Sequence, residues 1–223
     1  MEPQFEVLPP DRRVPQPPRK KPGGIIGGLI AFGYLILKFG SASLIFLKTG
    51  LTMLISIGAY SLIFGWKFAA GLVVLILVHE MGHFGAAKIY RVQVTAPMFI
   101  PFFGAYVMLK NRPMDPWINA MISYAGPLAG GLGGWACYYV GVASGLHWVM
   151  AVALYTFILN LVNLAPIPPL DGSHIWICFS RNRTPGMSFS DRVYTGIFLA
   201  ALIAGLILGC LETWGNLPPP ASL

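Results

Sequence analysis

The sequence predicts an all-α membrane protein, a polytopic bundle of about five to six transmembrane helices with a short, membrane-associated β-hairpin-like segment near residues 92–110. Two observations support this prediction. Hydrophobic residues make up 56% of the 223 residues and charged residues only 10%, whereas soluble domains carry about 25% charged residues. Long apolar runs also recur along the chain, and most Lys and Arg residues lie near their ends, which is typical of membrane topology signals.

Residues 1–23 are expected to form a disordered, basic, Pro-rich tail. They contain seven prolines and no apolar core of the kind that a secretory signal peptide requires. Such a composition favours an extended, unpacked chain. The remaining positive charges form no stripe or face, so the net charge of +7 does not indicate a nucleic-acid partner.

A single domain is expected over residues 24–215, followed by a short tail at 216–223. A spanning helix needs about 20 apolar residues, and the runs that reach or approach this length are 51–64, 68–87, 117–140, 148–165 and 193–211. The stretch 25–47 is apolar but is interrupted by Lys38 and several glycines. It forms a transmembrane span, a pair of short segments that enter the membrane without crossing it, or an interfacial helix.

Basic residues predict the orientation of the bundle. Most Lys and Arg residues beyond the tail flank one set of helix ends, whereas Lys67 lies at the other set. The positive-inside rule therefore places the segments 91–116 and 171–191 in the cytoplasm, together with the basic N-terminus. The stretch 25–47 then crosses the membrane zero or two times, and we favour the interfacial interpretation.

Acidic residues are scarce in the apolar runs. Of the eight acidic residues, Glu80 lies inside such a run and Asp171 ends the Pro-rich segment that follows the run 148–165; the others lie in the N-terminal tail, in loops or at a helix end. A charged group at the centre of a span costs at least about 2.5–3.5 kcal/mol on insertion scales. Such a residue normally faces the interior of the bundle, so both carboxylates are candidates for a functional site.

Glu80 lies between two histidines in the pattern His79-Glu80-Met81-Gly82-His83. Residues four apart on a helix project from one face, so both imidazoles can reach one zinc ion. The adjacent glutamate can then act as general base on the water that zinc activates. Buried histidines satisfied by backbone or neighbouring side chains are the alternative, which the apolar surroundings disfavour.

Asp171 is the candidate for the third protein ligand that a catalytic zinc site usually has. Prolines at 166, 168 and 169 end the preceding helix, and Gly172 frees the backbone. The Asp171 side chain can therefore turn toward another helix. One span separates the runs 68–87 and 148–165, so both run toward the cytoplasm and His83 and Asp171 are expected at the same end of the bundle.

Three motifs in this order resemble those of the site-2 protease family of intramembrane zinc metalloproteases. They are His79-Glu80-x-x-His83, Ala125-Gly126-Pro127 and Asn163-x-x-Pro166-x-x-x-Leu170-Asp171-Gly172. The resemblance implies a Zn²⁺-dependent endopeptidase with zinc held by His79, His83 and Asp171 and with Glu80 as base. It also implies a multi-pass protein in the lipid bilayer of a prokaryotic cell membrane. The substrates would be transmembrane segments of membrane-anchored proteins, cleaved in regulated intramembrane proteolysis after a first cut by another protease.

The chain departs from the family pattern at Gly130. Many members carry Asn at this position, three residues after the Pro of the Ala-Gly-Pro motif, so a helper polar contact is either absent or supplied by another residue. No stretch fits the extracytoplasmic peptide-binding domain or the C-terminal regulatory domain of some members. A minimal member is therefore expected.

Substrate-binding residues are suggested by the motifs and by the segment 92–116. Asn163 would steady the substrate backbone or the oxyanion, although helix-to-helix hydrogen bonding explains it as well; Asn160 is a weaker candidate. The segment 99–109 is rich in β-branched and aromatic residues, which predicts a hairpin. It would receive an unwound substrate by strand addition, with Gly104 permitting close approach. A hairpin that only plugs the cytoplasmic side is the alternative.

Two other functions use similar residues. A divalent-metal transporter would also place His and carboxylate groups in spans, but it needs successive polar sites, often on repeats. The sequence shows one compact cluster and no evident repeat. A catalytically inactive membrane adaptor of the same fold is disfavoured because His79, Glu80, His83 and Asp171 are all present.

Overall fold

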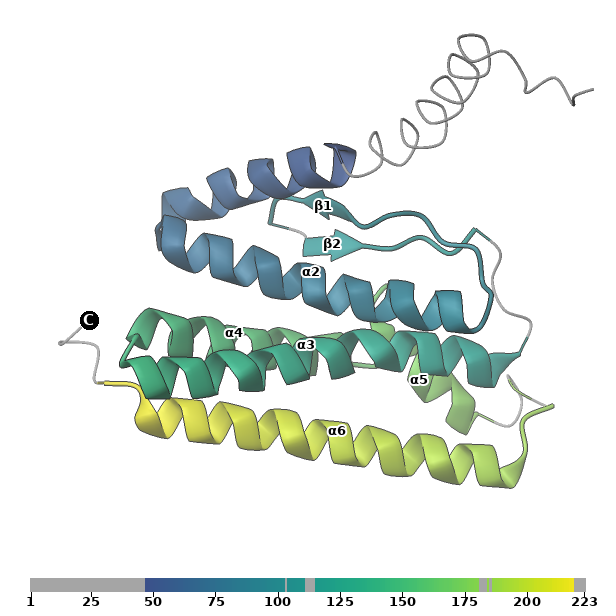
Figure 1. Ribbon diagram of the computed structural model, residues 1–223. Helices are drawn as coiled ribbons and strands as arrows, with labels where there is room; N and C mark the ends of the chain where they lie inside the picture. The colour runs from purple at the N-terminus through teal and green to yellow at the C-terminus, as the bar shows by residue number, and fades with distance from the viewer. Residues whose placement is uncertain (1–46, 103, 111–114, 181–183, 185, 219–223) are drawn as a thin grey trace, which may run out of the picture. The chain divides into compact units, whose positions relative to one another are not determined.

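The computed structural model describes residues 47–102, 104–110, 115–180, 184 and 186–218 (Figure 1). The predicted N-terminal tail, the interfacial stretch up to residue 46 and the last residues, 219–223, lie outside the described residues. Within the described part, the predicted helical bundle is confirmed, as is the small hairpin.

Five long helices form the described bundle, and each corresponds to one predicted apolar run. They are Leu47–Phe64, α2 (Trp66–Ile89), α3 (Pro116–Ser144), α4 (His147–Asn163) and α6 (Phe189–Asn216). The short helices α5 (Asp171–Trp176) and η1 (Ile177–Phe179) connect α4 to α6. Helix α4 ends two residues before the predicted limit at residue 165, because Pro166 follows and the residue before a proline disfavours helical backbone.

The membrane character of the chain is visible in its apolar helices. The helices Leu47–Phe64, α2 and α6 are long and apolar enough to cross a membrane, and α4 is a shorter apolar helix. Large apolar side chains point outward on these helices, among them Leu62, Leu208 and Phe198. Such a surface suits lipid and would be costly in water.

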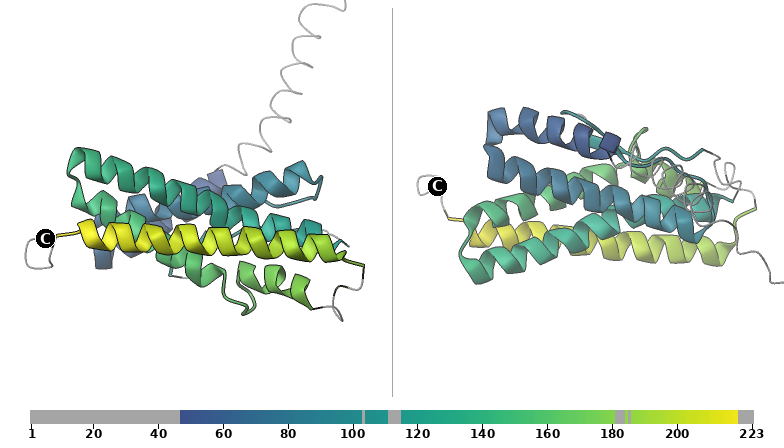
Figure 2. Two further views of the ribbon diagram at one scale, coloured as in Figure 1. Left: turned by 90° about the horizontal axis from the view of Figure 1, so that it is seen from below. Right: turned by 45° about the horizontal axis from the view of Figure 1, so that its top comes forward.

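Helices α3 and α4 lie between α2 on one side and α6 on the other (Figures 1 and 2). Glycines allow the close approach. A Cβ atom at Gly82 would lie 2.3 Å from the Ala125 carbonyl oxygen, so α2 meets the backbone of α3 directly. The fully buried Phe157 ring of α4 fills the space left by Gly134 of α3 and Gly209 of α6. Small residues at helix contacts are common in membrane bundles.

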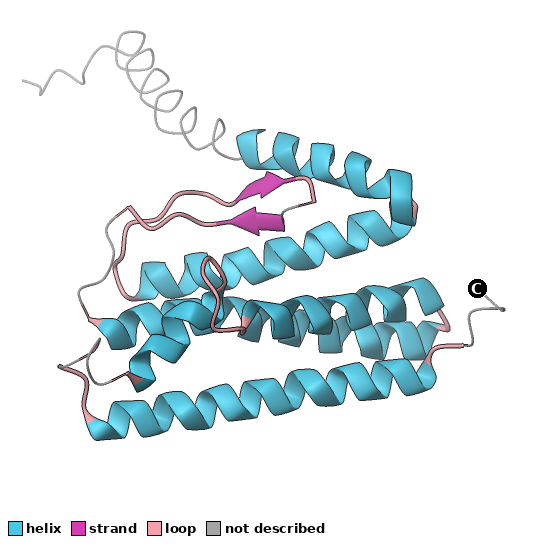
Figure 3. Cartoon of the chain, turned by 180° about the vertical axis from the view of Figure 1, so that it is seen from behind, coloured by secondary structure: helices cyan, strands magenta, loops and turns pink. Residues whose placement is uncertain are grey.

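The predicted hairpin consists of β1 (Met98–Ile100) and β2 (Gly104–Tyr106), which pair in antiparallel fashion (Figure 3). The helix Leu47–Phe64 covers the outer edge of β1. The Thr49 hydroxyl donates to the Pro97 carbonyl at 2.8 Å, and the Phe99 N–H donates to the Thr52 hydroxyl at 3.4 Å. The opposite edge, that of β2, faces α2.

The register identifies the backbone groups on the edge of β2. Phe99 pairs with Ala105, and the Phe99 N–H points away from β2 because it bonds to Thr52. Directly opposed residues in an antiparallel ladder either both bond to each other or both point outward. The N–H and C=O of Ala105 therefore point outward from β2, whereas those of Gly104 face β1.

Candidate metal centre

Helix α2 presents His79, Glu80 and His83 to the interior of the bundle. All three are buried, with 6%, 5% and 9% of their surface exposed. The two histidines lie one helical turn apart on the face that α2 turns toward α3 and α4. This arrangement is the one that their spacing of four residues predicts.

Asp171 reaches the same place from the segment that follows α4. The chain leaves α4 at Asn163, turns, and starts α5 at Asp171. Gly172 allows this tight return, because a Cβ atom there would lie 2.1 Å from the Leu164 carbonyl oxygen. The Trp176 indole N–H donates to the same oxygen at 3.0 Å and ties α5 to the end of α4.

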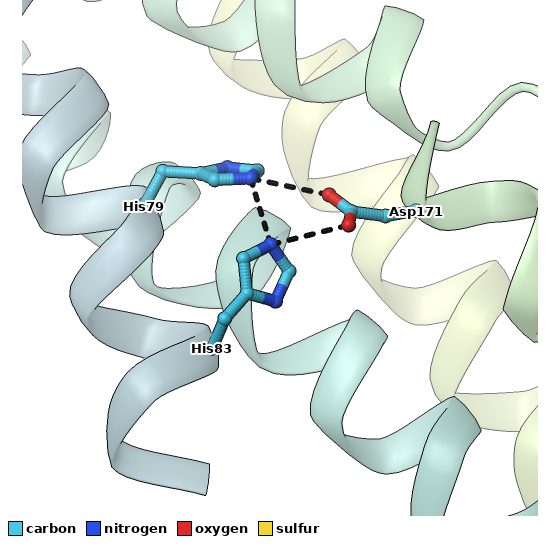
Figure 4. A group of neighbouring side chains, drawn as sticks. All are labelled: His79, His83 and Asp171. Carbon is cyan, nitrogen blue, oxygen red and sulfur yellow. Dashed lines mark hydrogen bonds and ion pairs between the residues drawn. The ribbon is translucent and has the colours of Figure 1, made fainter. Parts of the chain in front are cut away.

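The three side chains converge on one point, as Figure 4 shows. His79 Nε2 lies 3.1 Å from Asp171 Oδ2, His83 Nε2 lies 3.2 Å from Asp171 Oδ1, and the two Nε2 atoms are 3.0 Å apart. The possible ligand atoms of the group all lie within 4.8 Å of one another. His79, His83 and Asp171 therefore form a group that can hold a metal ion.

Hydrogen bonds on the far side of each ring set the histidine tautomers. His83 Nδ1 lies 2.8 Å from the Ile122 carbonyl oxygen, which can only accept, so this nitrogen carries a hydrogen. His79 Nδ1 lies 2.8 Å from Asn160 Oδ1, also an acceptor. In the neutral rings both Nε2 atoms then present lone pairs to each other and to the Asp171 carboxylate. A cation between them satisfies all of these lone pairs, and the donor set of two imidazoles and one carboxylate suits zinc.

The Asp171 carboxyl lies against both histidine rings. A carboxylate ligand binds metal in its deprotonated form, and a nearby cation favours that form.

Space for the His83 ring comes from Gly126 in the Ala-Gly-Pro motif. A Cβ atom at Gly126 would lie 2.2 Å from His83 Nε2 and 2.3 Å from its Cε1 atom. Any larger residue would displace the ring. This glycine therefore has a specific role at the site, beyond the general helix packing that glycines in this run suggest.

Glu80 lies beside this group rather than within it. The backbone N–H of Val107, which follows β2, lies against its carboxylate. Val107 and Ala105 are two residues apart and point to the same edge of the extended chain. Glu80 and the outward-facing groups of Ala105 thus lie along the same strand edge.

A cavity of about 350 Å³ adjoins His79 and Glu80. It is lined by α2, α4, the hairpin tip and the helix Leu47–Phe64, including Tyr60, Phe102 and Ala105. Gly104 and Asn163, the two residues singled out for substrate binding, also lie on its wall. Their roles stay predictions, and Gly104 has a φ of 92° that suits glycine.

Sequence reasoning gave little weight to Asn160 and missed Ile122 and Ala105. Asn160 contacts a histidine of the group directly, and its only signal in the sequence is a polar residue in an apolar run. The Ile122 contact runs through a backbone carbonyl, and Ala105 is placed by strand register. Neither contact depends on side-chain identity, so no motif could reveal it.

Comparisons with known proteins agree with the motifs. The sequence profile of peptidase family M50 matches residues 67–146. A probable chloroplastic zinc metalloprotease, EGY1, of Oryza sativa subsp. japonica is 38% identical over 79 residues, which cover 33% of this chain and 14% of that protein. Stage IV sporulation protein FB of Bacillus subtilis (strain 168) is 30% identical over 144 residues, or 62% of this chain and 48% of that protein. The chain therefore spans about half or less of the length of these relatives.

Proposed function

We propose that this chain, a member of the site-2 protease family, peptidase family M50, is a zinc-dependent endopeptidase that cleaves transmembrane segments of membrane-anchored proteins. One observation carries the proposal. His79, His83 and Asp171 converge from two separate elements on one point inside an apolar bundle, with the Glu80 carboxylate adjacent. Such buried ionisable groups are expensive to place in a membrane protein and mark functional sites.

Each residue then has a defined task in peptide hydrolysis. Zinc, held by His79, His83 and Asp171, would supply Lewis-acid polarisation of the scissile carbonyl and make water more acidic. Glu80 would accept a proton from the water that attacks the carbonyl carbon and pass it to the amine nitrogen as the C–N bond breaks. The Asn163 amide, on the cavity wall, would donate a hydrogen bond to the substrate backbone or to the developing oxyanion.

The cavity supports an extended substrate. A transmembrane helix must unwind before its peptide bonds can react, and an unwound backbone in an apolar setting needs new hydrogen-bond partners. The outward N–H and C=O of Ala105 offer such partners by strand addition, next to Glu80. Aromatic side chains on the cavity wall, among them Tyr60 and Phe102, suit apolar substrate residues.

The cellular setting is part of the same proposal. The N-terminus would be cytoplasmic in a multi-pass protein of a prokaryotic cell membrane, and the substrate would first be trimmed by another protease. The competing transporter needs a path of successive polar sites, whereas among the described residues one group of metal-ligating side chains is found.

Purified protein reconstituted in liposomes tests the function. The wild-type chain is expected to hold zinc and to cleave a model single-span substrate. Glu80→Gln should retain zinc and lose cleavage, because the carboxylate acts on water and does not bind the metal. Metal uptake without cleavage would support a transporter, and absence of both activities would support an inactive adaptor.

A further inference from the structure

We propose that Asn160 is the positioning residue of the metal ligand His79, and that Gly130 is the opening in α3 that makes this contact possible. Asn160 lies on α4 with only 2% of its surface exposed. Its amide nitrogen donates to the Thr156 carbonyl oxygen at 2.7 Å, and a carbonyl can only accept. This bond fixes the orientation of the amide, so that Oδ1 faces His79 Nδ1 at 2.8 Å.

The contact with Asn160 determines which ring nitrogen of His79 can bind a metal ion. Because Asn160 Oδ1 accepts, His79 Nδ1 carries the hydrogen and the lone pair lies on Nε2, toward Asp171. A partner of this kind fixes both the tautomer and the orientation of a ligating ring. His83 Nδ1 donates in the same way to the Ile122 carbonyl oxygen, a backbone group that a side-chain substitution does not remove. Asn160 is therefore the side chain through which the ligand set can be altered without touching a ligand.

Gly130 explains how Asn160 reaches its position. A Cβ atom at Gly130 would lie 2.5 Å from Asn160 Oδ1, 2.6 Å from Nδ2 and 2.9 Å from Cγ. The side-chain amide of Asn160 thus occupies the space that any side chain at position 130 would enter. The helper contact that the family pattern expects from α3 at this position is supplied from α4, and the two positions are coupled.

The test measures metal binding, so it separates this inference from the proposed function on which it rests. The zinc affinity of the full chain in detergent micelles is measured by competition with a chromophoric chelator, and Co²⁺ substitution reports the ligand geometry by its visible spectrum. Asn160→Ala should weaken zinc binding roughly 10- to 100-fold and alter the Co²⁺ spectrum, the effect typical of losing such a partner. Asn160→Leu keeps most of the side-chain volume but offers no acceptor to His79 Nδ1, so it should weaken zinc binding by a similar factor.

Three further variants make the result specific. Asn216→Ala is the matched control, because Asn216 also joins two helices, through a 3.1 Å bond to the Tyr138 hydroxyl far from the site; its zinc affinity should be unchanged. Gly130→Asn alone should weaken binding, since its side chain collides with Asn160. Combined with Asn160→Ala it should recover affinity, because the new amide enters the vacated space.

The outcomes are distinct. Equal zinc affinities for Asn160→Ala and Asn216→Ala, or an Asn160→Leu variant that binds zinc as tightly as the wild type, would overturn the role of Asn160. A double variant no better than Asn160→Ala would overturn the role of Gly130. A wild-type chain that binds no zinc would overturn the proposed function and this inference together.

Discussion

Strand addition at β2 predicts that one backbone N–H controls turnover. Replacing Ala105 with lactic acid exchanges its N–H for an ester oxygen and leaves the side chain in place. The Val107 N–H interacts with Glu80, and the Gly104 N–H faces β1, so Ala105 supplies the donor for an added strand. Leaving one buried partner unpaired costs about 1–3 kcal/mol, which slows cleavage roughly ten- to a hundredfold.

The assay is single-turnover cleavage of a single-span substrate in liposomes, with zinc content measured in the same preparation. Zinc content should be unchanged, because Ala105 contributes nothing to the metal group. Ala105→Ser keeps the N–H and should cleave at close to the wild-type rate. Full activity of the ester variant would refute pairing through this amide and leave the hairpin as a plug.

Three further predictions follow from the site and the topology. Asp171→Ala should lose most of its zinc affinity, since it removes one of the ligands in the group; unchanged stoichiometry and affinity by chelator competition would exclude Asp171 from the ligand set. Gly126→Ala should also weaken zinc binding, because its Cβ atom would lie 2.2 Å from His83 Nε2, whereas Gly85→Ala on α2 meets nothing within 4 Å and should bind zinc normally. In a background without native cysteines, Lys110→Cys should react with an impermeant thiol reagent from the cytoplasmic side and Ser144→Cys from the other, and labelling of both from one side would contradict the predicted orientation.

The helices could be predicted from the sequence because burial in lipid demands long apolar runs. Their ends follow local chemistry: Asp115 accepts a bond from the Trp117 N–H, and Pro116 occupies the first turn of α3. The hairpin was predicted from β-branched and aromatic residues, but the placement of its strands was not. Which edge is covered depends on Thr49 and Thr52, on a helix about 50 residues earlier in the chain.

The metal group could be predicted to the extent that it depends on spacing and on charge. His79 and His83 share a helix face by geometry, and Asp171 ends the Pro-rich segment that follows an apolar run. The hydrogen-bond partners of the two histidine rings could not be predicted from the sequence. The Ile122 carbonyl and Asn160 reach the histidines only because α3 and α4 pack against α2 at particular rotations, and helix rotation follows from the whole set of packed side chains.

Glycines complete the physical account of the site, because three of them provide space for a particular group. Gly126 accommodates the His83 ring, Gly130 the Asn160 amide and Gly172 the Leu164 carbonyl. In the sequence, Gly126 and Gly130 indicate close helix packing and Gly172 indicates a free backbone after the prolines. A substitution that relaxed packing alone would lower the stability of the whole bundle and leave the metal affinity of the folded fraction intact. A substitution at Gly126 or Gly130 displaces a ligand or its partner, so zinc affinity should fall in protein that remains folded.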